Sequence, residues 1–277
     1  MKKEAVVLYH NDCFDGFSGA WVAWKKFGKK AKYIGLEHQE PPPKGLVGND
    51  LFFIDFTYSA SQMRAIKKKA RRLVVLDHHE SHKGATQVAH EYRFSLDYSG
   101  CMLAWMYFFS RRRAPHFLQS VQDQDLFVFR KPYTREIISY LGARDQDFHT
   151  WDTFMKAGEN NKKRREIISI GATLLRARQK MVERTLPYAM PVLFEGYRTL
   201  AINSPVYYSE LANGIYSKLK KPFGISWYYR DHKIHVSLRS DGKIDVSKFA
   251  VKYGGGGHRG ASGFTVPIKK DFPWKFL

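Results

Sequence analysis

The sequence is poor in cysteine and has no long hydrophobic segment. Its 2 cysteines, Cys13 and Cys101, are too few for a disulfide framework and fit a reducing cytoplasm. No apolar run approaches the roughly 18 residues of a membrane-spanning helix. The first residues lead directly into a short apolar run, without the longer stretch and cleavage site of a signal peptide. We therefore expect a cytoplasmic protein that does not span a membrane.

Negative charge is also scarce. The chain has 46 Lys and Arg against 26 Asp and Glu, a formal net charge of +20. A positive field of this size attracts polyanions, among which nucleic acid is the obvious partner. Basic runs such as residues 67–69 and 162–165 are equally typical of solvated helix faces, so charge alone leaves solubility as the alternative explanation.

The apolar pattern predicts an α/β fold with two domains. Short apolar runs alternate with helical patterns in the first part of the chain, which is typical of a parallel sheet with crossover helices. A long stretch without proline then predicts a helix, and further strand-like runs follow it. We predict a parallel-sheet N-terminal domain at residues 1–158, a helical linker at 159–190 and a smaller α/β C-terminal domain at 191–277.

Each of the three N-terminal apolar runs stops at residue types that bind metal ions. Parallel strands place their carboxyl ends at one edge of the sheet, where open α/β folds bind ligands. We therefore expect carboxylates and imidazoles to converge there, with a further acidic group from Asp123 or Asp125. The strand-end residues are His10, Asp12 and Asp15 after the first run, Asp55 after the second, and Asp77, His78 and His79 after the third.

Such a carboxylate cluster predicts bound cations. Neighbouring carboxylates repel each other and raise their pKa values, and divalent cations remove that cost. Mixed carboxylate and imidazole ligands favour Mn²⁺, with Mg²⁺, Co²⁺ or Zn²⁺ as alternatives. Two cations about 3.5–4 Å apart are the usual means of displacement at phosphorus. A single Asp after a strand is more often a turn residue, but three such strand ends are hard to explain in that way.

These motifs resemble those of the DHH phosphoesterase superfamily. Asp77, His78 and His79 match the motif that names the family, residues 10–16 resemble its first motif, Asp55 its second and Asp123 its fourth. The glycine-rich segment 254–264 resembles the signature of the associated substrate-binding domain. The superfamily includes RecJ-type exonucleases, nano-RNases, cyclic-dinucleotide phosphodiesterases and family II pyrophosphatases.

The resemblance implies a role for each matching residue. It places His10 and Asp12 on one cation and Asp15 on the other, with Asp55 bridging both and with His78 and Asp123 completing the second site. It also implies that Asp77 supports its neighbours and that His79 faces the substrate phosphate. For the C-terminal domain it implies phosphate binding by His258, Arg259 and the backbone of Gly256 and Gly257, with Arg239 as a weaker candidate.

Two positions depart from the family pattern or leave a choice. The commoner first motif spaces its two aspartates two residues apart, whereas Asp12 and Asp15 are three apart. Asn11 or a water molecule is therefore an alternative to Asp12. In the fourth motif Asp125 competes with Asp123, and the sequence leads us to prefer Asp123.

The C-terminal signature guides the expected substrate. It differs from the basic motif of family II pyrophosphatases, and we expect a two-domain layout without the extra nucleic-acid-binding domain of RecJ-type enzymes. We predict a two-metal phosphodiesterase that releases nucleoside monophosphates from short oligonucleotides. Cyclic dinucleotides, other small phosphoesters or pyrophosphate are alternative substrates, and a catalytically inactive nucleic-acid-binding protein is the alternative of another class. The oligomeric state, monomer or homodimer, is left open.

Overall fold

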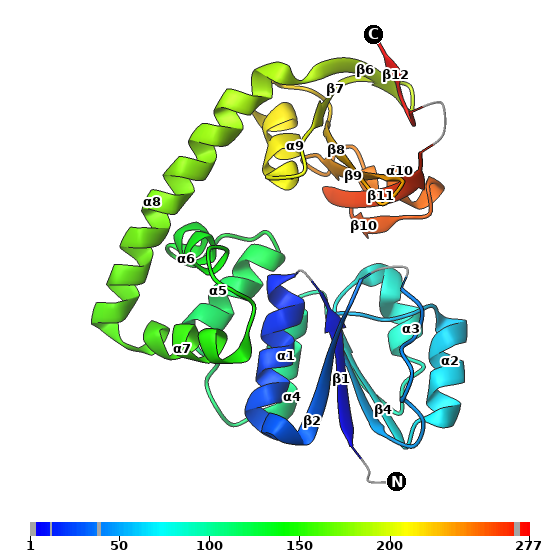
Figure 1. Ribbon diagram of the computed structural model, residues 1–277, viewed down its shortest axis with the longest axis vertical. Coiled ribbons are helices and arrows are strands. Elements are labelled where there is room, and N and C mark those ends of the chain that lie inside the picture. The colour runs from blue at the N-terminus through cyan, green and yellow to red at the C-terminus, as the bar shows by residue number, and fades with distance from the viewer. Residues whose placement is uncertain (1–3, 12, 38–39, 269–271) are drawn as a thin grey trace. The chain divides into compact units, whose positions relative to one another are not determined.

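The computed structural model describes residues 4–11, 13–37, 40–268 and 272–277, so Asp12 lies outside the described residues. The chain forms two compact units, residues 1–175 and 176–277. Each unit combines helices with a β-sheet (Figure 1). The predicted α/β class is confirmed, and the two units are described separately below.

The first unit is built around five parallel strands in the order β2-β1-β3-β4-β5. Tyr9 pairs with Ile54, and Ile54 pairs with Leu76, so the three central strands end side by side. This register brings the residues that follow those strands to one edge of the sheet. The strands are β1 (Ala5–His10), β2 (Ala31–Leu36), β3 (Asp50–Ile54), β4 (Arg72–Asp77) and β5 (Glu91–Phe94).

The central strands are buried on both faces, which explains their continuous apolar sequences. In β4, Val74 and Leu76 pack on one side with α1, α4, α5, α6 and α7. Leu73 and Val75 pack on the other side with α2 and α3. The helices are α1 (Phe14–Phe27), α2 (Ala60–Lys69), α3 (Lys83–Thr86), α4 (Gly100–Phe108), α5 (His116–Asp125), α6 (Thr134–Leu141) and α7 (Phe148–Glu159).

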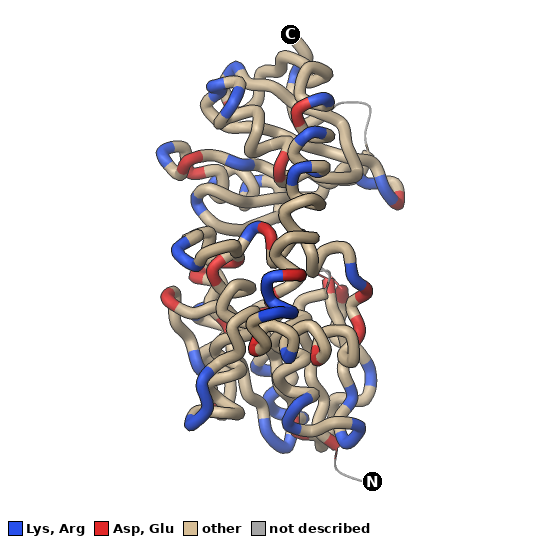
Figure 2. Tube along the Cα trace, turned by 90° about the vertical axis from the view of Figure 1, so that its left-hand side faces the viewer, with Lys and Arg blue, Asp and Glu red and all other residues tan. Residues whose placement is uncertain are grey.

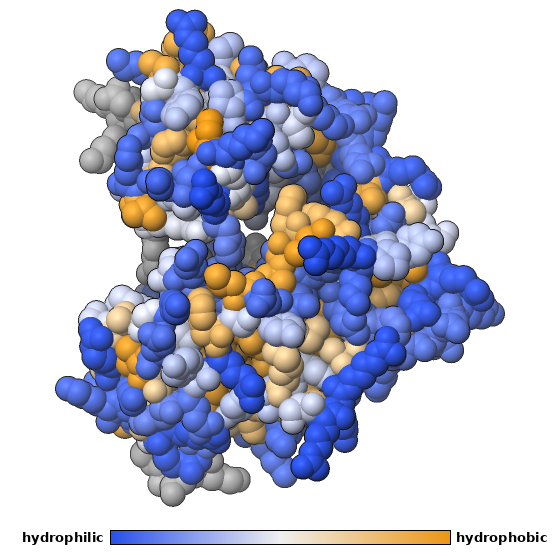
Figure 3. Space-filling model, turned by 180° about the vertical axis from the view of Figure 1, so that it is seen from behind, coloured by the Kyte–Doolittle hydropathy of each residue, from blue (hydrophilic) through white to orange (hydrophobic). Residues whose placement is uncertain are grey.

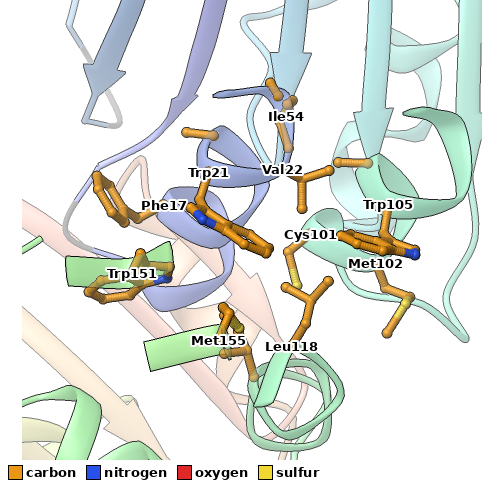
Figure 4. Close-up of a cluster of buried hydrophobic side chains, with 14 of the residues drawn as sticks. Phe17, Trp21, Val22, Ile54, Cys101, Met102, Trp105, Leu118, Trp151 and Met155 are labelled. Carbon is orange, nitrogen blue, oxygen red and sulfur yellow. The ribbon is translucent and has the colours of Figure 1, made fainter. Parts of the chain in front are cut away.

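Large aromatic side chains hold α1 in place (Figure 4). Trp21 of α1 stacks on Trp105 of α4, with ring centroids 6.2 Å apart. Phe17 meets the ring of Trp151 edge-on, with centroids 4.8 Å apart. The indole N–H of Trp151 donates a hydrogen bond to Ser18 Oγ at 2.9 Å, so this buried polar atom is satisfied. The packing fixes the helix whose first turn carries Asp15.

The second unit contains a mixed seven-stranded sheet in the order β10-β11-β9-β8-β7-β6-β12. Alternate residues of β9, namely Ile234, Val236 and Leu238, join an apolar cluster with Val246 and Ala250 of α10. The intervening residues of β9 are polar. The elements are β6 (Met190–Phe194), β7 (Tyr197–Asn203), α9 (Tyr208–Ser217), β8 (Gly224–Arg230), β9 (Lys233–Arg239), α10 (Val246–Lys252), β10 (Gly256–His258), β11 (Ala261–Pro267) and β12 (Lys275–Phe276).

A single helix of 25 residues, α8 (Asn161–Thr185), connects the two units. The chain passes from one compact unit to the other inside this helix, between Leu175 and Arg176. The helical character of the linker agrees with the sequence, whereas its limits at residues 159 and 190 stay predictions.

The surface is mainly hydrophilic. Figure 2 shows Lys and Arg along the trace of both units, interspersed with fewer Asp and Glu. On the face drawn in Figure 3, hydrophobic residues gather in patches between hydrophilic ones. Among the described residues, no helix combines the length and hydrophobicity needed to cross a membrane.

The burial of β4 leads to a test of the fold. Leu76 is 0% exposed and precedes the edge residue Asp77, whereas Leu96 is 55% exposed in the same unit. We expect Leu76→Ala to lower the free energy of unfolding by about 2–5 kcal/mol through lost burial and a cavity. Leu96→Ala is the matched control, with an expected change of about 0.5 kcal/mol or less. Urea unfolding followed by circular dichroism measures both, and equal losses would contradict the assigned burial.

Candidate metal centre

Residues at the carboxyl ends of β1, β3 and β4 form the centre. His10 is the last residue of β1, Asp77 is the last residue of β4, and Asp55 directly follows β3. Asp55 has a φ of 58°, a left-handed conformation that aspartate adopts more readily than most residues. Its backbone N–H donates to the carbonyl of Leu76 at 2.9 Å, which keeps it bound to the sheet while the chain turns.

Asp55 lies between two groups of donor atoms. It is 1% exposed. Its Oδ2 atom lies 3.7 Å from Nδ1 of His10 and 3.7 Å from Sγ of Cys13. Its other oxygen, Oδ1, lies 3.2 Å from Nε2 of His78. A carboxylate whose two oxygens face different donor groups has the arrangement of a ligand that bridges two cations.

The two donor groups have different compositions. The first consists of His10, Cys13 and Asp55, and the second of Asp15, His78 and Asp125. Within each group the ligand atoms all lie within 4.8 Å of one another. In the second group, Nε2 of His78 lies 3.3 Å from Oδ2 of Asp125. Cys13 therefore takes part in the first group with the imidazole and the bridging carboxylate.

The start of α4 orients Asp15. The backbone N–H of Cys101 donates to Oδ1 of Asp15 at 3.1 Å. A Cβ atom at Gly100 would lie 2.6 Å from Cβ of Asp55 and 2.9 Å from Oδ2 of Asp15. At Gly16, near the start of α1, a Cβ atom would lie 2.2 Å from the carbonyl oxygen of His10. Both glycines therefore allow a helix to begin against the centre.

Electrostatics make the centre costly without cations. Burial and the neighbouring Asp55 raise the pKa of Asp15. Burial raises the pKa of Asp125 well above its ordinary value, and the charges of Asp15 and Asp55 add to the effect. Burial alone would lower the pKa of His78, but its hydrogen bond with Asp55 and the nearby carboxylates raise it to about 10. The free centre therefore holds protons that cations can replace.

The donor atoms fit a pair of divalent cations. Oδ2 of Asp15 and Oδ2 of Asp125 are buried and accept no hydrogen bond from the part of the chain that the structure describes. Buried carboxylate oxygens of this kind require a partner. Carboxylate, imidazole and thiolate are all ligands of divalent metals in proteins. The residues that could hold the cations are His10, Cys13 and Asp55 for one, and Asp15, Asp55, His78 and Asp125 for the other.

Asp77 has a separate place beside the centre. It is fully buried, and its Oδ1 accepts hydrogen bonds from the backbone N–H groups of His78 and His79 at 2.7 and 3.1 Å. Its two oxygens also pair with Nδ1 of His79 and Nδ1 of His82, each at 2.8 Å. Burial lowers the pKa of His79, but the hydrogen bond with Asp77 and the charge of Asp55 raise it to about 9. In the metal-free centre the pairing with Asp77 therefore favours the charged form of His79.

His82 was missed by the sequence analysis. It ends the short 3-10 helix Glu80–His82, which brings it back to the same carboxylate that holds His79. The rings of His79 and His82 lie with centroids 5.0 Å apart. Its position three residues after His79 is the only sequence signal that identifies it.

The sequence favoured Asp123 over Asp125 as a metal ligand, but the structure places Asp125 with the donor atoms. Asp123 accepts hydrogen bonds from the backbone N–H groups of Arg130 and Lys131 at 2.8 and 3.1 Å, and from Thr134 Oγ1 at 2.5 Å. Its carboxylate therefore closes the loop after α5. Residues two apart on a helix point in nearly opposite directions, so only one of the two reaches the centre. The preference for Asp123 as ligand is corrected in favour of Asp125.

The C-terminal unit carries the residues expected to bind phosphate. His258 pairs with Ala261, and Ala261 pairs with Arg239, in one row across three strands. Side chains in such a row lie on the same face of the sheet, with only the small Ala261 between the imidazole and the guanidinium. Nη2 of Arg239 donates to Ser209 Oγ at 2.7 Å. Arg259 is exposed and directly follows the last residue of β10.

The local structure requires glycine at only one of the two glycine positions of β10, Gly256 and Gly257. Gly257 has a φ of 130°, and a Cβ atom there would lie 2.6 Å from the carbonyl oxygen of Ala261. Backbone conformation and space therefore both require glycine at this position. At Gly256 a Cβ atom would meet nothing within 4 Å, so local packing does not explain that glycine.

The chain is similar to several known proteins. Residues 201–273 match the DHHA1 domain family. The chain is 31% identical over 298 residues to an uncharacterized protein of Acanthamoeba polyphaga mimivirus, covering 98% of this chain and 69% of that protein. Its fold is similar to the DHH domain of a member of a ribosomal protein family, with a TM-score of 0.61, 13% identity and coverage of 99% of this chain and 83% of that chain. Residues 201–273 therefore form a DHHA1 domain, and the chain has the fold of DHH proteins.

A second solved structure shares the DHH fold. It is an exopolyphosphatase-related protein from Bacteroides fragilis, with a TM-score of 0.52, 14% identity and coverage of 98% of this chain and 88% of that chain. The DHH fold and the DHHA1 region expected from the sequence are confirmed.

Cys13 is the main departure of this DHH protein from the family pattern. It stands two residues before Asp15, the spacing at which the commoner first motif has an aspartate. The sequence alone led us to expect Asp12 in that role, and Asp12 lies outside the described residues. The spacing from Asp15 was the signal that could have identified Cys13.

The close approach of Gly100 gives a test of the DHH centre. Because an added Cβ atom would push against Asp55 and Asp15, we expect Gly100→Ala to weaken Mn²⁺ binding by about tenfold or more, that is by about 1.4 kcal/mol. Gly84→Ala is the matched control, since a Cβ atom there meets nothing within 4 Å. Isothermal titration calorimetry measures both affinities. Equal affinities for the two variants would show that Gly100 does not shape the centre.

Protonation gives a second test. Asp15 and Asp125 have pKa values raised by burial, and His78 has a pKa of about 10, so all three hold protons more firmly than usual. Cations must displace these protons, and we expect the affinity for Mn²⁺ to rise with pH and to fall as the solution becomes acidic. Calorimetry in buffers of different ionisation enthalpy measures the protons released. An affinity independent of pH, without proton release, would contradict the assigned ligands.

Proposed function

We propose that the protein is a two-cation phosphodiesterase that releases nucleoside monophosphates from short oligonucleotides. The observation that carries this proposal is the position of Asp55, whose two oxygens face separate donor groups at 3.7 and 3.2 Å. A shared carboxylate with imidazole and carboxylate donors on each side is suited to displacement at phosphorus. The residues proposed to bind the cations are His10, Asp15, Asp55, His78 and Asp125.

When bound, the cations lower the pKa of a water molecule and stabilise charge on the phosphoryl oxygens. Carboxylates and imidazole in the second donor group suit Mn²⁺, which we propose as its cation. Asp77 orients the chain after β4 through hydrogen bonds to two backbone N–H groups. The same carboxylate keeps the ring of His79 charged, and we propose that this ring binds a non-bridging oxygen of the substrate phosphate.

Two features support an oligonucleotide as substrate. The net charge of +20 favours a polyanion. In the DHHA1 region, His258 and Arg239 share one sheet face, and the exposed Arg259 follows His258 in the sequence. We propose that these residues bind phosphate groups, with the backbone of Gly257 approaching the oxygens. The reducing conditions implied by 2 cysteines support action in the cytoplasm.

The substrate panel that tests this proposal contains labelled RNA and DNA from dinucleotides upward, a cyclic dinucleotide and pyrophosphate. Each is incubated with the protein and Mn²⁺, and mass spectrometry identifies the products. We expect nucleoside monophosphates from the shortest linear substrates at the highest rate. Turnover confined to the cyclic dinucleotide or to pyrophosphate would replace the proposed substrate with one of these.

Substitution of the bridging residue separates catalysis from binding. We expect Asp55→Asn to lower kcat by about a thousandfold or more, since it removes the charge that both donor groups share. Oligonucleotide binding, followed by fluorescence anisotropy, is expected to persist. Asp97→Asn is the matched control, because Asp97 is exposed in a loop of the same unit. If the wild type binds oligonucleotides but hydrolyses no member of the panel, the protein is a binding protein and the proposal fails.

A further inference from the structure

The two cysteines have different surroundings. Cys101 is fully buried in the apolar cluster of the first unit, and Figure 4 shows it among hydrophobic side chains of α1 and α4. Its sulfur lies 3.4 Å from Oγ of Ser99. Cys13 belongs to no apolar cluster of the described residues. Core packing, the usual role of a free cysteine, therefore accounts for Cys101 but not for Cys13.

The backbone places Cys13 against the centre. Cys13 precedes α1 in an extended conformation, with φ of −127° and ψ of 133°, and its side chain does not cap the helix. Sγ lies 3.7 Å from Oδ2 of Asp55, the same oxygen that lies 3.7 Å from Nδ1 of His10. Nitrogen, sulfur and oxygen donors thus surround one point, with their ligand atoms within 4.8 Å of one another.

The ligand chemistry of this group differs from that of its neighbour. Thiolate and imidazole ligands favour Zn²⁺ and similar borderline cations, whereas carboxylate and water ligands suit Mg²⁺ and Mn²⁺. The second group, Asp15, His78 and Asp125, contains no sulfur. The two positions of the centre therefore differ in the cation that they prefer.

We propose that the Cys13 thiolate, His10 and Asp55 together form the first cation site, which selects Zn²⁺ or Co²⁺ over Mg²⁺. The thiol loses its proton to solvent as the metal–sulfur bond forms, and no oxidation or reduction takes place. The proposal rests on the two-cation centre of the proposed function but not on the identity of the substrate.

Cobalt spectroscopy tests the proposed bond directly. Metal-free protein is titrated with Co²⁺ without oxygen, and the visible d–d bands report binding while near-ultraviolet charge-transfer absorption reports a thiolate ligand. We expect the wild type to show charge-transfer absorption that saturates with the first site. Cys13→Ser is expected to lose it, and Cys101→Ser, the matched control, to retain it. Cobalt binding without this absorption in the wild type, or its persistence in Cys13→Ser, would overturn the proposal.

A carboxylate substitution tests selectivity and does not depend on the behaviour of Cys13→Ser. Cys13→Asp keeps a negatively charged ligand but removes the sulfur, so we expect the preference for Zn²⁺ over Mg²⁺ to fall by about tenfold or more in competition titrations. Circular dichroism verifies that each variant is folded. An unchanged preference in folded Cys13→Asp protein would contradict the proposal. Charge-transfer absorption in a protein that hydrolyses no member of the substrate panel would support this site while refuting the proposed activity.

Discussion

Repulsion among buried carboxylates at the end of a parallel sheet is the constraint on which the first unit depends. Both faces of the sheet are covered by apolar clusters, so little water reaches the strand ends to screen charge. Asp15, Asp55 and Asp125 nevertheless lie buried or half-buried there. Local groups offset part of the cost: His78 lies beside two of these carboxylates, and the start of α4 donates a hydrogen bond to the third. The raised pKa values of Asp15 and Asp125 show that this compensation is incomplete without cations.

Asp77 lies at the same edge of the sheet, but hydrogen bonds stabilise its buried carboxylate. Its pKa is raised by burial, but hydrogen bonds with His79 and His82 outweigh that effect and lower the pKa below its ordinary value. The carboxylate is thus fully paired, in contrast to those of Asp15 and Asp125, each of which has a buried oxygen that accepts no hydrogen bond from the described residues. Asp77 at the end of β4 holds imidazole side chains and backbone in position, while Asp55 after β3 turns its two oxygens toward the two donor groups. The naming triplet of the family therefore combines a supporting carboxylate with imidazoles that face the centre.

Features that depend on the local apolar pattern could be predicted from the sequence, whereas features that depend on helix phase, loop contacts or strand register could not. The continuous apolar runs of β1, β3 and β4 require a sheet covered on both faces, so the parallel sheet and the convergence of its strand ends followed from pattern alone. The choice between Asp123 and Asp125 depended on the phase of α5 and on a loop that captures one carboxylate, and neither is visible in a motif. The row that joins His258 to Arg239 depends on strand register, because the two residues are far apart in the sequence.

Cys13 matters for the charge balance of the centre as well as for the preference of a sulfur ligand for softer cations. Two divalent cations carry four positive charges, whereas the carboxylates of the two donor groups, Asp15, Asp55 and Asp125, supply three negative charges. A thiolate at position 13 would add a negative charge, as an aspartate would, so the exchange of oxygen for sulfur would leave the charge of the buried site unchanged. Since Asp55 touches both groups, a change of ligand at the first site also alters the charge that this carboxylate can offer to the second. In the proposed centre the two sites are therefore coupled through Asp55, and a sulfur ligand at Cys13 would influence both.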